Sequence, residues 1–372
     1  LLGKHFRTTE RREPGDSLQA NKDTGFISIY IFNAEGRRVS LTDGALHRGP
    51  YVDSPNTLMR LDLPPRTTYT AVISEESLPP VQQNFTLSAL STATVDLVPA
   101  KARYPYLAKT EGAWTRSTAG GNAESPRYST NPQSSLDVSR YADVSILLEC
   151  PDAEPAVHIK LFWSKGKRIA KVRSRDVVQD SGDYRRGCAL AEKKGLSPGE
   201  YTIVCSTFAP DQLGPFVLWV SSTAPCEVKL LPPEGAGRRA VISDIGILPP
   251  GKDRMLASLR VPRLTRMKLI ARSRQSTIGS RSVAPSSALM TVELGQGPYK
   301  ETLASSEDGV HSDAIGGIRI EDFDLEPGLE ERGGVWIVIE RIGGPGGQVE
   351  DHFEVEVLGE ERAEIGEWMV ED

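Results

Sequence analysis

Apolar residues along this chain come in short runs that alternate with polar, turn-forming segments. The runs are rich in Val, Ile, Leu, Thr and Tyr, and the connections carry Gly, Pro, Asn and Asp, which is the composition of strands and turns. From residue 26 to 98, no segment keeps the spacing of an amphipathic helix. The strands predicted from this pattern are 26–32, 69–74, 85–90, 95–98, 144–148, 159–163, 201–204, 216–220, 335–339 and 353–357. The pattern therefore predicts an all-β fold of antiparallel β-sandwiches.

One block of sequence occurs twice, over residues 36–69 and again over residues 166–201. Both copies begin with Gly, two basic residues and an aliphatic residue, and both end at a Tyr-Thr pair that opens an apolar strand. Each copy continues into a second apolar strand, at Phe85 or at Phe216. A weaker third copy of this strand pair lies within residues 335–357. Because the repeat is too long for a solenoid, its unit is a whole domain and the chain is a tandem array.

The repeat predicts three domains, and a length of 372 residues fits two to three. Residues 1–100 are predicted to form a first sandwich that is truncated at its N-terminus. Residues 110–230 form a second sandwich, and residues 238–372 a third, diverged one. The predicted linkers are 99–111 and 231–237, the second being rich in Pro and Gly.

Composition narrows the classes of protein. With 38% hydrophobic and 25% charged residues, the chain has enough apolar material for several small cores. No apolar run approaches the roughly 20 residues that cross a bilayer, and the start has neither a methionine nor a signal-peptide layout, which favours a fragment. A net charge of −6 argues against nucleic-acid binding. The four cysteines have no Cys-x-x-Cys spacing, which disfavours zinc, and their sparseness favours free thiols and a cytosolic location.

The predicted third domain is electrically asymmetric. Between Arg254 and Val292 there are eight basic residues and no acidic one, whereas residues 293–372 are strongly acidic. The basic residues are Arg254, Arg260, Arg263, Arg266, Lys268, Arg272, Arg274 and Arg281. Two interpretations are open: the halves balance each other inside one domain, or a basic face binds acidic lipid headgroups or an acidic partner.

The strongest local motif precedes the second predicted domain. It consists of Gly112-Ala113-Trp114, then Ala119-Gly120-Gly121-Asn122, then Asn131-Pro132-Gln133. Paired glycines allow close backbone approach, a tryptophan covers the end of a sandwich, and Asn-Pro fixes the chain as it enters a strand. These roles are structural, so the motif residues are predicted to support the fold rather than chemistry.

Together with the segments around Tyr201 and Phe216, this motif resembles the C2-like β-sandwich of calpains, also called calpain domain III, over residues 110–222. Residues 25–98 resemble the later part of the same domain. Tandem domains of this kind resemble the PalB-like calpains of fungi and their animal relatives. The resemblance implies a cysteine endopeptidase with a Cys, His, Asn triad, associated with ambient-pH signalling at ESCRT-decorated membranes.

No catalytic residue is predicted in this chain. The Gln-Gly segment and Asp-Cys-Trp of the family are absent, no cysteine precedes a Trp, and the five histidines are scattered. The sequence Gly195-Leu196-Ser197-Pro198-Gly199 imitates a nucleophile elbow, but proline has no N–H for an oxyanion hole and a strand follows, so a turn is predicted. An independent hydrolase is therefore disfavoured.

No cofactor or metal is predicted. Calcium needs several converging carboxylates, and the nearest group, Asp176, Asp180 and Asp183, lies among arginines, which favours salt-linked loops. A calcium site stays a weakly supported alternative.

Basic residues follow the strand that ends at Trp163. The predicted anion- or partner-binding residues are Arg168, Lys171, Arg173, Arg175, Arg185 and Arg186. They form either a patch for anionic lipid or a solvated strand edge that discourages aggregation.

The sequence thus predicts the non-catalytic regulatory or docking region of a calpain-like cysteine endopeptidase. Its predicted partners are the upstream protease core, ESCRT-type proteins or an anionic membrane surface, and its predicted location is cytoplasmic and peripheral at endosomal or plasma membranes. The alternative is a stand-alone adaptor that binds a protein through a sheet edge or through the acidic C-terminal domain.

Overall fold

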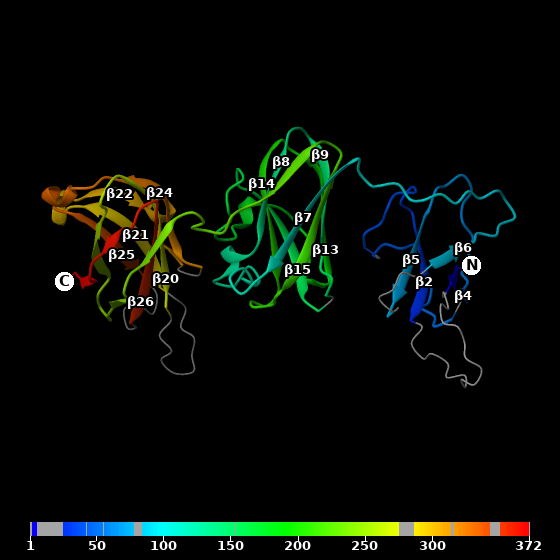
Figure 1. The fold of residues 1–372 in the computed structure, drawn as a ribbon, viewed down its shortest axis with the longest axis horizontal. Coiled ribbons are helices and arrows are strands. Elements are labelled where there is room, and N and C mark those ends of the chain that lie inside the picture. The colour runs from blue at the N-terminus through cyan, green and yellow to red at the C-terminus, as the bar shows by residue number, and fades with distance from the viewer. Residues whose placement is uncertain are drawn as a thin grey trace, which may run out of the picture. The chain divides into compact units, whose positions relative to one another are not determined.

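The computed structural model describes residues 2–5, 25–41, 43–54, 56–77, 84–152, 154–274, 286–313, 316–342 and 350–371. Antiparallel strands and loops dominate these residues (Figure 1), which confirms the all-β fold class with β-sandwich architecture. The helical segments are short 3-10 turns: η1 (Tyr128–Thr130), η2 (Ser174–Asp176), η3 (Gly297–Tyr299), η4 (Ser306–Gly309) and η5 (Leu329–Arg332). Within the described ranges, none of the helices has the length and apolar character needed to cross a membrane.

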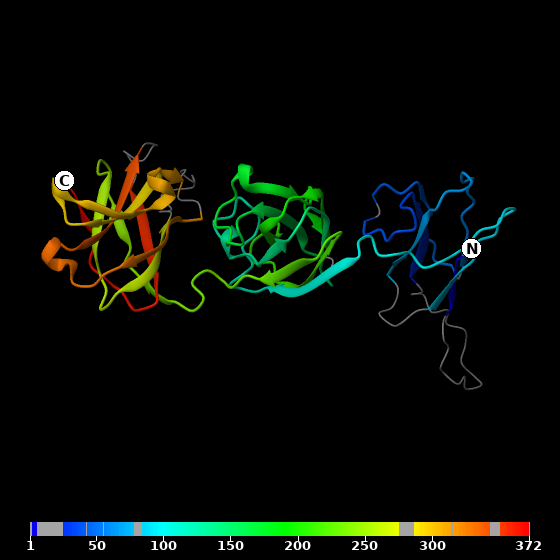
Figure 2. The ribbon, with the colours of Figure 1, turned by 90° about the horizontal axis from the view of Figure 1, so that it is seen from above.

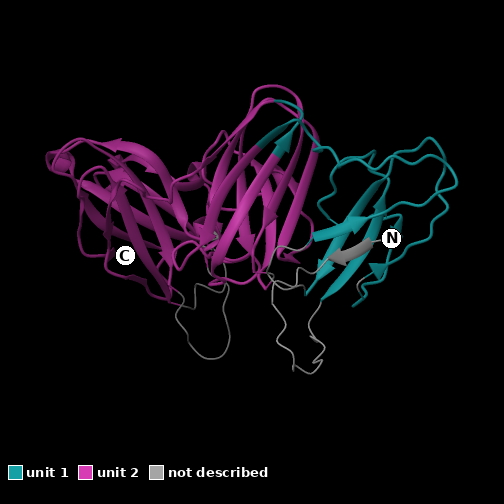
Figure 3. Cartoon of the chain, turned by 45° about the vertical axis from the view of Figure 1, so that its right-hand side comes forward, with its two compact units in different colours: residues 1–107, 221–224 teal, residues 108–220, 225–372 magenta. Residues whose placement is uncertain are grey.

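Contacts divide the chain into two compact units, coloured separately in Figure 3. The N-terminal unit holds residues 1–107 with 221–224, and the second unit holds residues 108–220 with 225–372. The predicted boundaries of three domains, 1–100, 110–230 and 238–372, stay a prediction.

The N-terminal unit has two sheets of three strands. One sheet has the order β4 (Asn56–Thr57), β1 (Leu2–His5), β6 (Asn84–Leu87), and the other β3 (His47–Arg48), β2 (Phe26–Phe32), β5 (Thr70–Glu76). Its core is small, formed by Ile27, Ile29 and Ile31 on one face of β2. The chain enters this unit through β1, and Leu1 and Phe6 on either side of it lie outside the described residues.

Two strand predictions in this unit are wrong. Strand β6 ends at Leu87 instead of residue 90, and residues 95–98 form no strand. The apolar side chains there are exposed, with Val95 52% and Val98 76% accessible. A β-branched run becomes a strand only where a neighbouring strand offers backbone hydrogen bonds, and no described strand pairs with residues 95–98.

The middle sandwich, green in Figures 1 and 2, pairs a sheet of six strands with one of four. The first contains β11 (Val177–Asp180), β10 (Ala156–Trp163), β14 (Gly199–Thr207), β8 (Gln133–Val138) and β16 (Cys226–Leu230), with β12 (Arg185–Arg186) paired to β10. The second contains β13 (Cys188–Leu196), β9 (Ala142–Glu149), β15 (Gly214–Ser222) and β7 (Tyr106–Trp114). Alternate residues of these strands fill the space between the sheets. Because β7 begins at Tyr106, the first predicted linker, 99–111, is shorter than expected.

The C-terminal sandwich pairs a sheet of five strands with one of seven. The first contains β17 (Arg239–Ile242), β26 (Asp351–Gly359), β20 (Thr265–Ser273), β24 (Ile318–Leu325) and β18 (Gly246–Leu248). The second contains β22 (Glu301–Ser305), β21 (Ser287–Leu294), β25 (Val335–Ile342), β19 (Arg254–Arg260), β27 (Glu364–Ile365), β23 (Ser312–Asp313) and β28 (Met369–Val370). The predicted third copy is β25 and β26, which lie in opposite sheets, as β14 and β15 do.

The internal repeat is visible in hydrogen bonds. In the first copy the Thr70 hydroxyl donates to the carbonyl of Arg37 at 2.9 Å. In the second copy the Thr202 hydroxyl donates to the carbonyl of Lys167 at 2.7 Å. The same side chain thus closes the same loop in both copies, which supports the interpretation of the block as a repeat.

Candidate functional site

The motif before the middle sandwich is held together by Asn131. Its amide oxygen accepts from the backbone N–H of Gly120 at 3.2 Å, and its Nδ2 donates to the carbonyls of Gly121 at 2.8 Å and Tyr128 at 3.0 Å. The side chain is fully buried, so its polar groups depend on these partners. Asn131 therefore closes the loop of residues 119–131.

Neighbouring motif residues are also held by hydrogen bonds. Gln133 accepts from the N–H of Ile169 at 2.7 Å and donates back to its carbonyl at 2.9 Å, while the carbonyl of Pro132 accepts from the N–H of Cys205. The Trp114 indole donates to the carbonyl of Cys205 at 3.0 Å.

Close packing explains the remaining motif residues. The ring centroids of Phe216 and Trp114 are 4.6 Å apart. A Cβ added to Gly112 would lie 2.4 Å from the Phe216 ring, so only glycine fits there. The Tyr201 hydroxyl donates to the carbonyl of Ser197, which closes the turn over residues 195–199 between two strands. A strand follows Ser197 instead of a helix, so the resemblance to a nucleophile elbow ends there.

Arg168 is turned toward the protein. Its two Nη atoms donate to the carbonyls of Ser129 at 2.7 Å, Asn131 at 3.0 Å, Pro232 at 3.1 Å and Leu231 at 3.4 Å. The pKa of Arg168 is lowered from its ordinary value. Burial is the main cause, the positive charge of Arg319 acts in the same direction, and the negative charge of Glu234 opposes them. Arg168 thereby fastens the linker after β16 to the loop around η1.

The following basic residues differ in their surroundings. Arg173 forms an ion pair with Glu307 of the C-terminal sandwich. Arg175 is largely exposed and lies 3.7 Å from Asp176. Lys171 is half-buried and has an interaction of its own.

Arg185 and Arg186 lie elsewhere. They form β12, which pairs with Val157 and Ala156 at the beginning of β10, whereas residues 168–175 follow the end of that strand. Eight strand residues span roughly 25 Å. The structure therefore separates the six predicted residues into two groups instead of one patch, and both arginines of β12 are exposed.

The charge asymmetry of the C-terminal sandwich is balanced internally. Every described basic residue from 254 to 292 lies within 4 Å of an acidic side chain. The pairs are Arg254 with Glu293, Arg260 with Glu330, Arg263 with Glu361, Arg266 with Asp322, Lys268 with Glu234, Arg272 with Glu356, and Arg274 with Glu354. Arg281 lies outside the described residues. These pairs support the charge-balancing interpretation over a free basic face.

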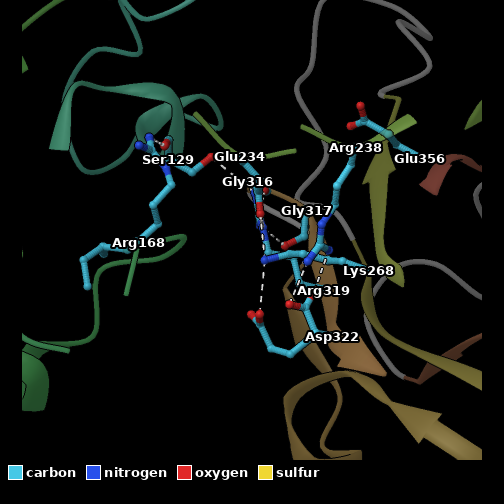
Figure 4. A network of polar contacts seen from close by, with 12 residues as sticks. Ser129, Arg168, Glu234, Arg238, Lys268, Gly316, Gly317, Arg319, Asp322 and Glu356 are labelled. Atoms are coloured by element: carbon cyan, nitrogen blue, oxygen red, sulfur yellow. Dashed lines mark hydrogen bonds and ion pairs between the residues drawn. The ribbon is translucent and has the colours of Figure 1, made fainter. Parts of the chain in front are cut away.

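A buried ionic cluster joins the two sandwiches of the second unit (Figure 4). We call it the Arg319 network, and it consists of Ser129, Glu234, Lys268, Gly316, Gly317 and Arg319. Arg319, whose side chain is 7% exposed, binds the Glu234 carboxylate with two parallel hydrogen bonds of 3.0 and 3.1 Å.

The remaining N–H groups of Arg319 are also satisfied. Nη1 donates to the carbonyls of Gly316 at 2.6 Å and Gly317 at 2.9 Å, and Nη2 donates to the Ser129 hydroxyl at 3.2 Å. All five guanidinium N–H groups thus have acceptors, a set that lysine cannot replace. Ser129 belongs to the middle sandwich, so one side chain connects both sandwiches.

Glu234 is the anion at the centre of this network. Burial raises its pKa, but the charges of Arg319 and Lys268 and their hydrogen bonds outweigh burial and lower it to about 2. Lys268 lies 2.9 Å from the carboxylate. The carboxylate therefore stays ionised at any pH met in a cell, and the network fixes the linker between the sandwiches. Sequence reasoning missed it, because Glu234 stands in a linker and Arg319 in a strand between two isoleucines.

The cysteines are unlike catalytic thiols. Burial raises the pKa of Cys150 to about 11 and raises that of Cys205 still further, with smaller contributions from neighbouring groups. A nucleophilic cysteine needs a lowered pKa.

Two of the three aspartates considered for calcium lie beside basic side chains. Asp180 lies 3.4 Å from Lys160, and Asp176 lies 3.7 Å from Arg175. Among the residues that the structure describes, no group of three or more His, Cys, Asp or Glu side chains is arranged to hold a metal ion.

His158 is a buried histidine of the middle sandwich. It is 3% exposed, stacks on Tyr184 with ring centroids 4.7 Å apart, and its Nδ1 has no hydrogen-bond partner among the described residues. Burial and the charge of Lys160 lower its pKa to about 4, against Asp180 and Asp183, which raise it. The folded state therefore holds this imidazole neutral.

We expect the stability of the middle sandwich to depend on His158 below neutral pH. The unfolded chain takes up a proton near pH 6.5 and the folded chain only near pH 4, so the free energy of unfolding falls as the pH drops between these values. The expected loss is on the order of 3 kcal/mol. Urea unfolding at neutral pH and near pH 4 should show a smaller fall in His158→Phe than in the exposed control His47→Gln. Equal falls in both variants would exclude this role.

Comparison with known proteins identifies a matching family model and several relatives of this chain. Residues 234–372 match the family model described as "Calpain-like protease palB-like, C-terminal domain". The chain is 71% identical over 373 residues to the calpain-like protease palB/RIM13 of Aspergillus oryzae, and 69% identical over 372 residues to the calpain-like protease palB of Emericella nidulans. It is 31% identical over 473 residues to the calpain-like protease palB/cpr-8 of Neurospora crassa. All of this chain is matched in each case, but only 44%, 43% and 50% of the respective relative.

These matches confirm the resemblance to calpain-like proteases over the whole length of the chain. Within that class the relatives are of the palB type, and the chain corresponds to their C-terminal region, including the palB-like C-terminal domain. It spans less than half the length of the Aspergillus oryzae and Emericella nidulans relatives.

Proposed function

We propose that this chain is the non-catalytic regulatory and docking region of a calpain-like cysteine endopeptidase. The observation that carries the proposal is full-length similarity, at 71% identity, to a calpain-like protease more than twice as long. The proposed domain type is the C2-like sandwich of calpain domain III. The proposed setting is intracellular pH signalling, at the surface of an endosomal or plasma membrane and with ESCRT-type partners.

The mechanism we propose is positional. The Arg319 network and the ion pair between Arg173 and Glu307 join two sandwiches into one body, so a contact on one sandwich orients the other. Such a body can hold a protease core against a partner surface and raise the local concentration of substrate. A stand-alone adaptor is the alternative, and the length of the relatives favours the protease.

Capture of the protease segment tests this function. The matching upstream segment of the same polypeptide, expressed separately, should bind this chain in a pull-down with or without calcium, and should leave an unrelated β-sandwich unbound. Failure to bind under both conditions would favour the adaptor.

Arg185 and Arg186, two solvent-facing members of the predicted basic set, carry the proposed contact with an acidic partner, while the exposed Arg175 belongs to the group at the other end of β10. We propose a supporting role for Arg168, Lys171 and Arg173. Arg168 and Arg173 already bind other groups of the protein, namely the Ser129 carbonyl and the Glu307 carboxylate.

Charge reversal in β12 should weaken this contact. Arg185→Glu with Arg186→Glu is expected to lower capture of an acidic partner about 30-fold, because each reversed charge near a surface costs on the order of 1 kcal/mol. Arg60→Glu with Arg66→Glu makes the same charge change at exposed sites of the N-terminal unit and serves as the control. If both double variants lost capture of the acidic partner equally, net charge alone would explain the effect.

A further inference from the structure

The N-terminal unit and the middle sandwich share one strand order. In the middle sandwich the first sheet runs β11, β10, β14, β8, β16, and the matching sheet of the N-terminal unit runs β3, β2, β5. Register fixes the match, since Phe162 pairs with Thr202 as Phe32 pairs with Thr70. The second sheets run β13, β9, β15, β7 and β4, β1, β6. Among the described residues, the N-terminal unit therefore has no counterpart of β7 or of β8.

Strand β5 has an open edge. The carbonyl of Ile29 in β2 accepts from the residue after β3, so its backbone points away from β5, and the next residue, Tyr30, is left to bond with Val72. Because successive residues of a strand point their backbone groups to opposite sides, those of Ala71 and Ile73 face away from β2. No described strand pairs with β5 on that side. In the middle sandwich, β8 fills this place between β14 and β16.

The edge of β6 is open as well, and it exposes an aromatic side chain. Phe85 of β6 occupies the repeat position of Phe216 in β15. Phe216 is 3% exposed, because Trp114 and Gly112 of β7 pack against its ring. Phe85 is 59% exposed. The two phenylalanines thus differ as expected if a counterpart of β7 is what covers Phe85.

Apolar residues after β6 are exposed in the same unit. Val95, Leu97 and Val98 are 52%, 53% and 76% exposed. They follow β6 as β16 follows β15, and β16 is held in its sheet by pairing with β8. Exposed apolar side chains beside an unpaired strand edge form a surface to which another extended segment can add.

The repeat also indicates what fills these edges. Strands β7 and β8 precede β9 in the chain, and β9 holds the place in its sheet that β1 holds in the N-terminal unit, so their counterparts belong upstream of β1. The chain matches only 44% and 43% of the Aspergillus oryzae and Emericella nidulans relatives and corresponds to their C-terminal region, so these relatives carry a long segment on that side.

We propose that the open edges of β5 and β6 bind two extended segments of the same polypeptide, from the part that the relatives carry upstream of the matched region. One segment pairs with Ala71 and Ile73 and lies between β5 and residues 95–98, as β8 lies between β14 and β16. The other pairs with β6 and places an aromatic side chain over Phe85. This inference rests on the proposed function, since its occupant is the upstream part of the protease polypeptide, and it adds where that part enters the fold.

Hydrogen exchange tests the proposal on two forms of the protein. One is this chain, and the other is the same chain extended upstream in its own polypeptide by as many residues as hold β7 and β8, 106–138. The amides of Ala71 and Ile73 should exchange about 100-fold more slowly in the extended form, because they become bonded within a sheet. The amide of Val72, which faces β2, should be protected in both forms.

A substitution at Phe85 gives a second readout. Phe85→Ser should speed exchange of the Ile29 amide, a marker of unfolding of this unit, about 100-fold in the extended form, where the ring is buried. In this chain the same change should alter it by less than about threefold, because the ring is already exposed. Tyr299→Ser, at a position 96% exposed in the C-terminal sandwich, is the control and should leave the exchange of Ile29 unchanged in both forms.

Three results would overturn the proposal. They are equal exchange of Ala71 and Ile73 in both forms, an equal effect of Phe85→Ser in both forms, and a dimer of this chain that protects the same amides, which would assign the edges to a second copy. The extension covers two strands and not a protease core. Failure of strand addition is therefore distinguishable from failure of the core to bind in the pull-down.

Discussion

Replacing Gly120 with alanine should destabilise the middle sandwich by about 3 kcal/mol or more. A Cβ at this position would lie 2.1 Å from the carbonyl oxygen of Arg127 and 2.8 Å from the Thr130 hydroxyl. The backbone cannot move aside cheaply, since Asn131 fixes both sides of the loop with buried hydrogen bonds. The loop has to open, and those bonds are then lost. Thermal unfolding should show a midpoint lower by about 10 °C.

Gly214 provides the matched control. It begins β15, its backbone is not left-handed, and a Cβ added to it would have no described atom within 4 Å. Gly214→Ala should therefore unfold like the wild type. If Gly120→Ala were as stable as Gly214→Ala, the close packing of the glycine loop would be refuted.

Loss of Arg319 should release the C-terminal sandwich from its neighbour. Arg319→Met removes five hydrogen bonds and leaves the Glu234 carboxylate partly buried with Lys268 as its remaining cation. Breaking a buried ion pair costs about 3 to 5 kcal/mol, and the lower figure applies because the Glu234 side chain is 20% exposed. Limited proteolysis should then cut the linker at residues 231–237 much faster than in the wild-type chain.

A double-mutant cycle separates coupling from general damage. Arg319→Met with Glu234→Met should be less destabilised than the sum of the single variants, because neither ion is left without its partner. Arg332→Met is the control, since its pair with Glu301 is more than half exposed on both sides and should contribute at most about 1 kcal/mol. Strictly additive effects of Arg319 and Glu234 would contradict the network.

The ionisation of Glu234 sets the pH range over which the network acts. Its pKa is lowered from 4.5 to about 2, so its contribution to stability is complete above pH 4.5 and is lost as the pH falls toward 2. The fall in the free energy of unfolding that we expect from His158 occurs at higher pH, between 6.5 and 4. The two effects can therefore be told apart in one titration.

Alternation of apolar and polar residues was sufficient to predict most of the long strands and the repeat, because a strand buried on one face records its period in the sequence. It misjudged residues 95–98, where β-branched residues lie without a described neighbouring strand. It also placed the start of β7 in a linker, since one edge strand that alternates weakly resembles a loop. Strand pairing depends on which segments meet in the folded protein, so the sequence of a single segment does not predict it.

Site prediction failed for the same reason. Arg168 and Arg185 are near in sequence, but they lie at opposite ends of β10. Arg319 and Ser129 are 190 residues apart and share a hydrogen bond. Trp163 and Tyr201 come together only through the register of β10 and β14. Each of these groupings follows from which strands pair, and the pattern of residue types did not contain it.

The central proposal is that this region controls the activity of a protease core. The most direct measurement compares cleavage of a protein substrate by the full-length protease, by a form that ends before this region, and by full-length Arg319→Met. The account predicts that truncation lowers cleavage strongly and that Arg319→Met lowers it in part, while a small peptide substrate is affected less. Equal cleavage of the protein substrate by all three forms would contradict it.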